Sequence, residues 1–527
     1  MLKYKFMANF VKKITFIFTI IKFCFLVQVT ILLLTYPNCL NALIVSGFVY
    51  EDINGNNIFD KEDKGIYQVG VSNGIYIVLT DRKGKYSIDL KDSDYIFIIK
   101  PTNFSCPLNM KSSIPHFFSL FDVDNLKKEG LENVNFPLYK EKEKKEFSAI
   151  FLGDIQVRNE EQLGYFINAI MPNLLKENAD LYITLGDNVY DNMLLYPSLL
   201  ETMGQLNNPV YYTAGNHDIT SIADGPELQY LTYKKYIGPT YYSFNYANVH
   251  FVVLESVKWD GYRYFGEFGE KQLDWLKKDL KHVDDDSLVL FIMHIPVFRW
   301  DGKNKLKKTV SDADDFISII KAFKNSLIIA GHTHTIEKIY SKDFDTHHED
   351  HLKIPILIAG SISGNKWRDN RADELGIPYS RMKDGAPKGY YLISFKDNKF
   401  DETYIIPGKS QNKQMDVYVV DNNTLVDDGV VMENNTDNLS LVANVFNGDV
   451  YSKVFYSIND NKNIPMKREF LVDPLFNAIS VNKASYKSYH IWLANLDRLQ
   501  KGVHKIRVIY KDKNGREYEE FKVLRVK

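Results

Sequence analysis

The chain has 527 residues, of which 45% are hydrophobic and 25% charged, and its formal net charge is −2. These proportions are ordinary for a globular protein, and a chain of this length usually forms about three domains. The balanced charge argues against a nucleic-acid-binding protein, so no nucleic-acid partner is expected.

The first 42 residues predict an export signal. Four lysines within the first 13 residues precede an apolar stretch at 14–34, which only Lys22 interrupts, and Ala42 offers a small residue before a cleavage site. This order is typical of a secretory signal peptide. The apolar stretch is also long enough for an uncleaved signal anchor. We therefore expect an exported protein that is periplasmic, at the cell surface or secreted, or membrane-anchored if the signal is retained.

Residues 43–140 predict a β-sandwich domain. The segments 43–52, 69–81 and 84–90 alternate apolar and polar residues as half-buried strands do, with a turn at 81–84. The pattern resembles the small prealbumin-like or Cna-B-like β-sandwiches that stand in front of some secreted enzymes.

Within this domain, five carboxylate and amide side chains have the spacing of a calcium loop. They occupy positions 1, 3, 5, 9 and 12 of the loop: Asp52, Asn54, Asn56, Asp60 and Asp63. Asn57 stands where an EF-hand has Gly, and the short Asp63 stands where it has a bidentate Glu. Asn tolerates the left-handed backbone that this position requires. The alternatives are a Ca²⁺ site and an Asx-rich turn that holds no ion.

A charged run at 140–146 predicts a solvated linker, after which a central domain spans 146–410. Apolar strand patterns alternate there with helical patterns, such as those at 161–178 and 271–283. This alternation predicts an α/β domain with crossover helices.

Five short polar motifs of the central domain each follow a strand pattern. They are GDIQ at 153–156, GDNVYD at 186–191, GNHD at 215–218, MHIP at 293–296 and GHTH at 331–334. Polar residues at the ends of buried strands are typical of functional sites in α/β domains. Asp, Asn and His without Cys are ligands that suit Mn²⁺, Fe or Zn²⁺ at a reactive site better than a structural zinc ion.

In this order, the motifs resemble those of the calcineurin-like metallophosphoesterase superfamily. The β-domains on either side resemble a bacterial secreted subgroup with extra N-terminal and C-terminal domains. The resemblance implies a central α/β sandwich, in which two β-sheets are flanked by helices. It also implies a metal-dependent phosphoric ester hydrolase, either a phosphatase or a phosphodiesterase.

By the same resemblance, seven side chains hold two divalent ions (Mn, Fe or Zn), which offset the charge of a phosphate ester and acidify water. Metal 1 would take Asp154, Gln156, Asp187 and His334, and metal 2 would take Asp187, Asn216, His294 and His332. His217 would stabilise the transition state and could protonate the leaving oxygen. We expect Asp191 to be the hydrogen-bond partner of an imidazole, with Asp218 as the alternative.

Most of the superfamily has His where this chain has Gln156. An amide oxygen is a harder and weaker ligand than an imidazole. We therefore expect metal 1 to bind more loosely and to be Mn²⁺ or Fe rather than Zn²⁺.

Other polar and aromatic residues of the central domain have weaker interpretations. Trp367 and Arg368 follow a turn after a strand and could bind substrate, although structural packing explains Trp367 equally well. The histidines of THHEDH at 346–351 fit a solvated hairpin tip better than a second metal site.

Residues 411–527 predict a C-terminal β-rich domain without a catalytic cluster. It could shape the active-site cleft, bind the cell envelope or protect a sheet edge.

Taken together, these patterns predict an exported, monomeric phosphoesterase with two metal ions, which hydrolyses a phosphate mono- or diester. The alternative is a catalytically weak envelope- or glycan-binding module on the same fold.

Overall fold

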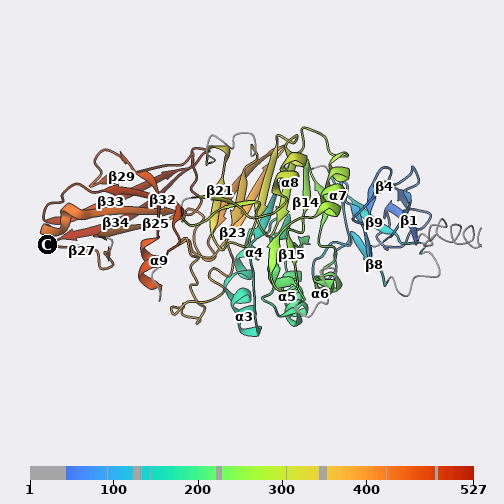
Figure 1. Ribbon diagram of the computed structural model, residues 1–527, viewed down its shortest axis with the longest axis horizontal. Helices are drawn as coiled ribbons and strands as arrows, with labels where there is room; N and C mark the ends of the chain where they lie inside the picture. Colours follow the sequence, from blue (N-terminus) through green and yellow to red (C-terminus); the bar gives the residue numbers. More distant parts are fainter. Residues whose placement is uncertain are drawn as a thin grey trace, which may run out of the picture.

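The structure, a computed structural model, describes residues 43–527 except 92, 123–130, 132, 143, 221–227, 304, 344–352, 423 and 481–484. The predicted signal and the THHEDH histidines therefore lie outside the described residues. No helix in the described part of the chain is long and apolar enough to cross a membrane. The N-terminal strands, the central domain and the C-terminal strands follow one another along the long axis (Figure 1).

Two small sheets form the N-terminal domain, as the strand patterns predicted. One has the order β2-β1-β9-β7, with β5 paired to β1, and the other has the order β4-β3-β6-β8. The strands are β1 (Ile44–Glu51), β2 (Lys64–Gly65), β3 (Gly70–Ser72), β4 (Ile77–Leu79), β5 (Lys85–Asp89), β6 (Tyr95–Ile99), β7 (Phe104–Ser105), β8 (Phe118–Leu120) and β9 (Phe136–Lys140).

The central domain contains two larger sheets. The first has the order β12-β11-β10-β23-β24, and the second has the order β13-β14-β17-β20-β22-β21. Their strands are β10 (Glu146–Leu152), β11 (Leu181–Thr184), β12 (Val210–Tyr211), β23 (Tyr390–Lys396) and β24 (Lys399–Ile405), then β13 (Tyr242–Tyr246), β14 (Val249–Val253), β17 (Leu288–Met293), β20 (Ser326–Ala330), β21 (Ile336–Ile339) and β22 (Ile356–Ala359). In the first sheet β10, β11 and β12 run parallel, and in the second sheet β14, β17, β20 and β22 do. Within each sheet the carboxyl ends of these strands therefore meet at one edge.

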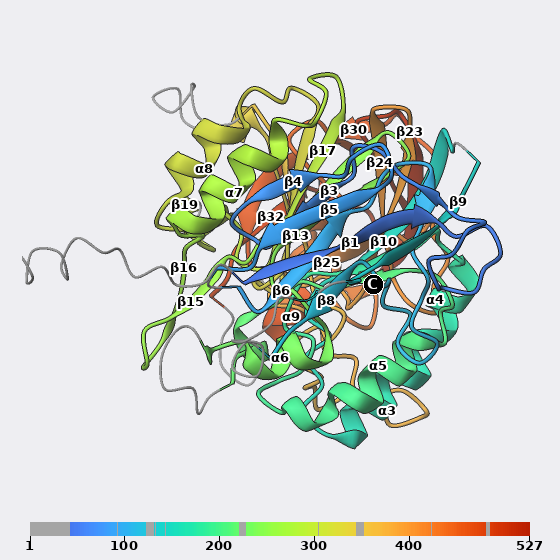
Figure 2. The ribbon, with the colours of Figure 1, turned by 90° about the vertical axis from the view of Figure 1, so that its right-hand side faces the viewer.

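Helices cover both outer faces of the two sheets, so the expected α/β sandwich is confirmed. Seen along the long axis, α3, α4 and α5 lie on one side of the sheets, and α7 and α8 lie on the other (Figure 2). The helices are α3 (Glu160–Ala169), α4 (Met171–Glu177), α5 (Tyr196–Gly204), α6 (Leu231–Tyr236), α7 (Glu270–Leu280) and α8 (Ala313–Ile320), with short 3-10 turns η1 (Met193–Leu195), η2 (Asn216–Asp218) and η4 (Ser341–Asp343). Two ribbons complete the domain, β15 (Val257–Trp259) with β16 (Tyr264–Gly266), and β18 (Phe298–Trp300) with β19 (Leu306–Lys308).

The single helix expected at 161–178 is two helices, α3 and α4, which meet at Ile170. Pro172 causes the break, because a proline ring clashes with the carbonyl of the preceding turn and supplies no N–H. Helix α8 was not predicted. Residues 240–256 and 389–406 form two hairpins, β13–β14 and β23–β24.

The C-terminal domain consists of two five-stranded sheets with their own apolar core. Its elements are β25 (Met415–Asp421), β26 (Thr424–Leu425), β28 (Leu439–Val445), β31 (Lys467–Leu471) and β32 (Ser488–Asn495), then β27 (Val430–Val431), β29 (Lys453–Ile458), β30 (Ile464–Pro465), β33 (Gly502–Lys511) and β34 (Glu517–Val526), with η6 (Glu433–Asn438) and α9 (Pro474–Ile479).

The N-terminal and central domains share one continuous apolar core. Trp275 of α7 is fully buried, and its indole N–H donates to Ser72 Oγ at 3.1 Å. The Tyr241 hydroxyl donates to the carbonyl of Gly74 at 2.7 Å. The two domains therefore fold as one packed unit.

Trp275→Ala should lower the free energy of unfolding by ~3–5 kcal/mol, because it leaves a large cavity at this shared core. Urea unfolding measures the loss. Tyr262→Ala is the matched control, because the Tyr262 side chain is 92% exposed and its removal should change stability little. Equal stabilities of the two variants would contradict a shared core.

Candidate metal centre

The five polar motifs meet where the two central sheets approach each other. Loops after β10, β11 and β12 carry Asp154, Asp187 and Asn216, all from the first sheet. Loops after β17 and β20 carry His294 and the two histidines of GHTH, from the second sheet. The strand ends thus deliver polar side chains from two directions to one buried place.

Five of the predicted ligands have a left-handed backbone conformation. Their φ angles lie between 47° and 71°: Asp154, Gln156, Asp187, His332 and His334. This region costs an L-residue roughly 1–2 kcal/mol, and such conformations cluster at functional sites. The chain therefore accepts backbone strain to aim these side chains inward.

Two motif glycines are required by close approach. A Cβ on Gly186, whose φ is +89°, would lie 2.5 Å from His294 Nδ1, and one on Gly215 would lie 2.1 Å from the Asp187 backbone nitrogen. No other residue fits either place, so both glycines are part of the site.

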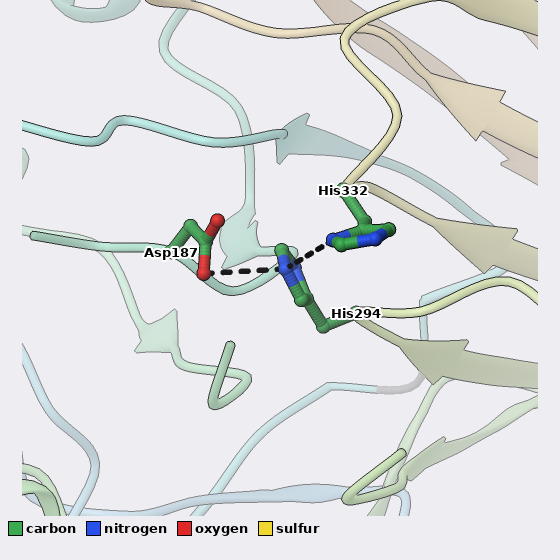
Figure 3. Close-up of side chains that lie close together, drawn as sticks. All are labelled: Asp187, His294 and His332. Carbon is green, nitrogen blue, oxygen red and sulfur yellow. Dashed lines mark hydrogen bonds and ion pairs between the residues drawn. The ribbon is translucent and has the colours of Figure 1, made fainter. Parts of the chain in front are cut away.

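Asp187, His294 and His332 form the centre of the site (Figure 3). Their ligand atoms all lie within 4.8 Å of one another. His294 Nε2 lies 3.2 Å from Asp187 Oδ1 and 3.2 Å from His332 Nδ1. Asn216 Oδ1 lies 3.0 Å from the same Nε2 atom.

The hydrogen bonds of His294 decide which atom faces this cluster. Its Nδ1–H donates to the carbonyl of Leu185 at 2.7 Å, which uses the only N–H of a neutral imidazole. Nε2 then presents a lone pair to the oxygens of Asn216 and Asp187. Lone pairs that face one another in a buried site require a positive charge between them, either a proton or a metal ion.

The charges around His294 also favour a cation at this place. Burial lowers its pKa, but the negative charges of Asp187 and Asp154 outweigh burial and raise the pKa to about 9. Burial and the charge of His294 hold the pKa of His332 well below its usual value. The site therefore attracts a cation and keeps a second imidazole neutral, as a ligand must be.

Asp154, Gln156 and His334 adjoin this centre. His334 Nδ1–H donates to the carbonyl of Gly364 at 2.6 Å, so its Nε2 lone pair lies 3.4 Å from Asp154 Oδ1. Gln156 Nε2 donates to Asp187 Oδ2 at 2.6 Å, which joins this group to the first.

The seven side chains fit two divalent cations. Asp154 Oδ1 and Gln156 Oε1 are buried and have no hydrogen-bond partner, although buried polar atoms nearly always have one. Both atoms are oxygens of predicted metal 1 ligands. Bound cations would satisfy both atoms and separate the lone pairs around His294 Nε2.

His217 lies beside this centre. Its backbone N–H donates to Asp187 Oδ1 at 2.8 Å, and its ring Nδ1 lies 2.8 Å from Asp191 Oδ1. The ring also stacks on Tyr190, with centroids 4.0 Å apart. Burial lowers the pKa of His217, but Asp191 and Asp187 outweigh burial and raise the pKa above its usual value.

Asp191 is thus placed as the expected imidazole partner, whereas Asp218 has another role. Asp218 is fully buried and accepts hydrogen bonds from the backbone of Asn188 and Gly215 and from the Tyr196 hydroxyl. It ties the GDNVYD loop to the GNHD loop and holds no imidazole.

The two weak substrate-binding candidates differ in outcome. Trp367 is 3% exposed, its indole N–H donates to the carbonyl of Ile155 at 2.9 Å, and it packs on Tyr165. The buried ring therefore supports the packing interpretation of Trp367 and not the substrate-binding one. Arg368 is exposed, and its role in substrate binding stays a prediction.

Sequence reasoning missed a group of basic and aromatic residues around His217. The guanidinium carbon of Arg158 lies 4.1 Å and Lys366 Nζ lies 5.0 Å from the centroid of the Tyr190 ring. Tyr190 belongs to the GDNVYD motif, so the sequence could have indicated that it lies near the site. Only the fold shows that Lys366, next to the buried Trp367, also lies there.

The predicted calcium loop closes through its own side chains. Asp52 accepts from the backbone of Gly55 and Asn57 at 2.8 and 2.7 Å, and Asp63 accepts from the backbone of Ile53 and Asp60. The Asn54 and Asn56 amides both donate to Asp60 Oδ2. Asn57 has φ 60°, so the left-handed position is confirmed. Calcium binding in this loop stays a prediction.

Three family sequence models match the chain. They are described as "Calcineurin-like phosphoesterase" at residues 147–335, "N terminal of Calcineurin-like phosphoesterase" at 51–141 and "C terminal of Calcineurin-like phosphoesterase" at 357–518. No curated protein matches the chain.

Several solved structures are similar to the chain, including the following two. "Structure of PhoD" has a TM-score of 0.37 and 13% identity over 68% of this chain and 85% of that chain. "Structure of purple acid phosphatase PPD1 isolated from yellow lupin (Lupinus luteus) seeds" has a TM-score of 0.36 and 12% identity over 64% of this chain and 67% of that chain.

Removing the central carboxylate should abolish metal binding. Mn²⁺ at about 100 times its dissociation constant should stabilise the wild-type protein by ~2.7 kcal/mol, and Asp187→Asn should lose most of this gain. Thermal unfolding with and without Mn²⁺ measures it, and metal analysis counts the ions. Asp274→Asn is the control, because that carboxylate is exposed on α7 and pairs with Lys277. Retention of both ions by Asp187→Asn would contradict the site.

Proposed function

Because the chain belongs to the calcineurin-like phosphoesterases that carry N-terminal and C-terminal domains, we propose that it hydrolyses a phosphate mono- or diester with the help of two divalent metal ions. The observation that carries the proposal is the convergence of buried lone pairs around His294 Nε2, next to two unpartnered oxygens. Mn²⁺, Fe and Zn²⁺ are all compatible with this donor set.

Each residue of the site has a chemical role in this proposal. When bound, two cations offset the negative charge of the ester and acidify the attacking water. Asp187 lies between the two ligand groups, because its Oδ1 adjoins His294 and its Oδ2 accepts from Gln156. Hydrogen bonds to the carbonyls of Leu185 and Gly364 fix the rings of His294 and His334, so that Nε2 of each faces the site.

His217 is the proposed general acid. Asp191 holds Nδ1 and the Tyr190 ring supports one face, so the imidazole has one orientation. Nε2 is then the atom that can give a proton to the leaving oxygen. Because the His217 backbone N–H also donates to Asp187, the position of the proposed acid relative to the predicted metal ligands is fixed.

His217→Ala should lower kcat by ~10²–10⁴-fold for an alkyl phosphate, because its leaving oxygen needs a proton. The loss should be much smaller for a nitrophenyl ester, because nitrophenolate leaves without one. Steady-state kinetics on both esters measure the difference. His282→Ala, an exposed histidine after α7, is the control. Equal losses on both esters would contradict the acid role.

The cations beside Tyr190 support a role in substrate binding. No carboxylate of the described residues forms an ion pair with Arg158 or Lys366. Lys366 is close enough to His217 for its positive charge to lower the pKa of that imidazole. Two unpaired cations on the side of the general acid would attract the negative charge of the ester and of its leaving group. A phosphate monoester, with its second negative charge, gains most from them.

Lys366→Gln should raise KM for a phosphate monoester about fivefold, the size expected for a partly exposed ion pair, with a smaller change for a diester. Higher salt should shrink the difference between variant and wild type. Kinetics at two ionic strengths test both statements. Lys281→Gln, at the end of α7, is the matched control. An unchanged KM would show that Lys366 does not bind the substrate.

We also propose that the protein is exported, supported by the signal pattern in residues 1–42. A substrate outside the cytoplasm, such as a phosphate ester of the cell envelope, would be consistent with export.

A further inference from the structure

Strand β21 is the point where the C-terminal domain reaches the metal centre. It begins at Ile336, two residues after the ligand His334, and it is the last strand of the second central sheet. In Figure 1 it lies on the side of the central domain that faces the C-terminal strands. An edge strand has unpaired backbone groups along its outer side, and something must cover them.

Asp384 of the central domain and Tyr489 of the C-terminal domain cover two of these groups. Strand β21 pairs with β22, so alternate backbone N–H groups point away from the sheet. Of these, the N–H of Ile336 donates to Asp384 Oδ2 at 2.6 Å, and the N–H of Lys338 donates to the Tyr489 hydroxyl. His490 Nε2 lies 3.2 Å from the same Asp384 oxygen. Tyr489 and His490 both belong to β32.

Between these two contacts, the fully buried side chain of Glu337 connects the C-terminal domain to the ligand loop. Its Oε1 accepts from the Tyr486 hydroxyl at 2.9 Å and from Thr335 Oγ1 at 2.8 Å. Thr335 Oγ1 lies 2.7 Å from Thr333 Oγ1. These two threonines stand on either side of His334, and both are buried.

The same carboxylate also reaches the ribbon β18–β19. Glu337 Oε2 accepts from the backbone of Trp300 at 2.7 Å, and the Trp300 ring packs against Tyr489. Both carboxylate oxygens of Glu337 thus accept hydrogen bonds in the protein interior. There each hydrogen bond is strong, and the loss of one partner destabilises the structure.

We propose that the C-terminal β-sandwich is part of the framework of the metal centre. Tyr489 holds β21 directly and His490 holds it through Asp384. Tyr486 acts through Glu337 and Thr335 to position the loop with His332 and His334. These are positioning residues, since none of them is a predicted ligand. The inference rests on the proposed function, because it assumes that this loop binds metal.

The test uses the full-length protein, stripped of metal, and Tyr486→Phe, which removes one hydroxyl from this chain of hydrogen bonds. Calorimetry with Mn²⁺ should show that at least one ion binds about tenfold more weakly than in the wild type, the usual effect of losing a residue that orients a ligand. Tyr456→Phe is the matched control, because Tyr456 packs in the core of the same sandwich. It should bind Mn²⁺ as the wild type does.

A second variant separates positioning from general damage. Thr335→Val keeps the shape of the side chain but removes its hydroxyl, and it should weaken Mn²⁺ binding similarly. If both hydroxyls act through Glu337, the double variant should lose less than the product of the two single effects. If both single variants bind Mn²⁺ as the wild type does, the inference is wrong. If the wild type itself binds no Mn²⁺, Fe²⁺ or Zn²⁺, the proposed function fails.

Discussion

The site depends on one electrostatic constraint, the close approach of several lone pairs in a buried place. Asp187, Asn216 and His332 all lie within 3.2 Å of His294 Nε2, while the other nitrogen of that ring is committed to a backbone carbonyl. This arrangement is stable only with positive charge inside it. The left-handed ligands and the two close-packed glycines are the local means by which the chain brings these atoms together.

The larger architecture supplies the rigidity that this arrangement needs. The predicted ligands come from the carboxyl ends of strands in two different sheets, so a shift of one sheet against the other would separate them. The N-terminal domain shares its core with the second sheet and α7, and the C-terminal domain contacts the edge strand β21 directly through Tyr489 and indirectly through His490 and Asp384. Both β-domains thus restrain the sheet that carries the histidines, although neither supplies a predicted ligand.

The sequence could predict where the polar motifs meet, because each follows an apolar strand and parallel strands place their ends together. The assignment of seven ligands within these motifs came from the family resemblance. The helix break at Pro172 was also readable in principle. The sequence favoured Asp191 over Asp218 as the partner of an imidazole, but each is the last residue of its motif, and only the fold shows which one reaches a ring. Substrate binding and packing stayed equally open for Trp367, because burial cannot be read from one aromatic residue after a turn. The contact between Tyr486 and Glu337 joins residues 149 positions apart in the sequence, so no local pattern could predict it.

Anomalous X-ray diffraction from crystals of the full-length protein grown with Mn²⁺ would locate the metal ions directly. We expect two anomalous peaks, one on either side of Asp187. One should contact Asp154, Gln156 and His334, and the other should contact Asn216, His294 and His332. A single peak, or peaks away from these side chains, would contradict the two-metal site and the hydrolysis proposed from it.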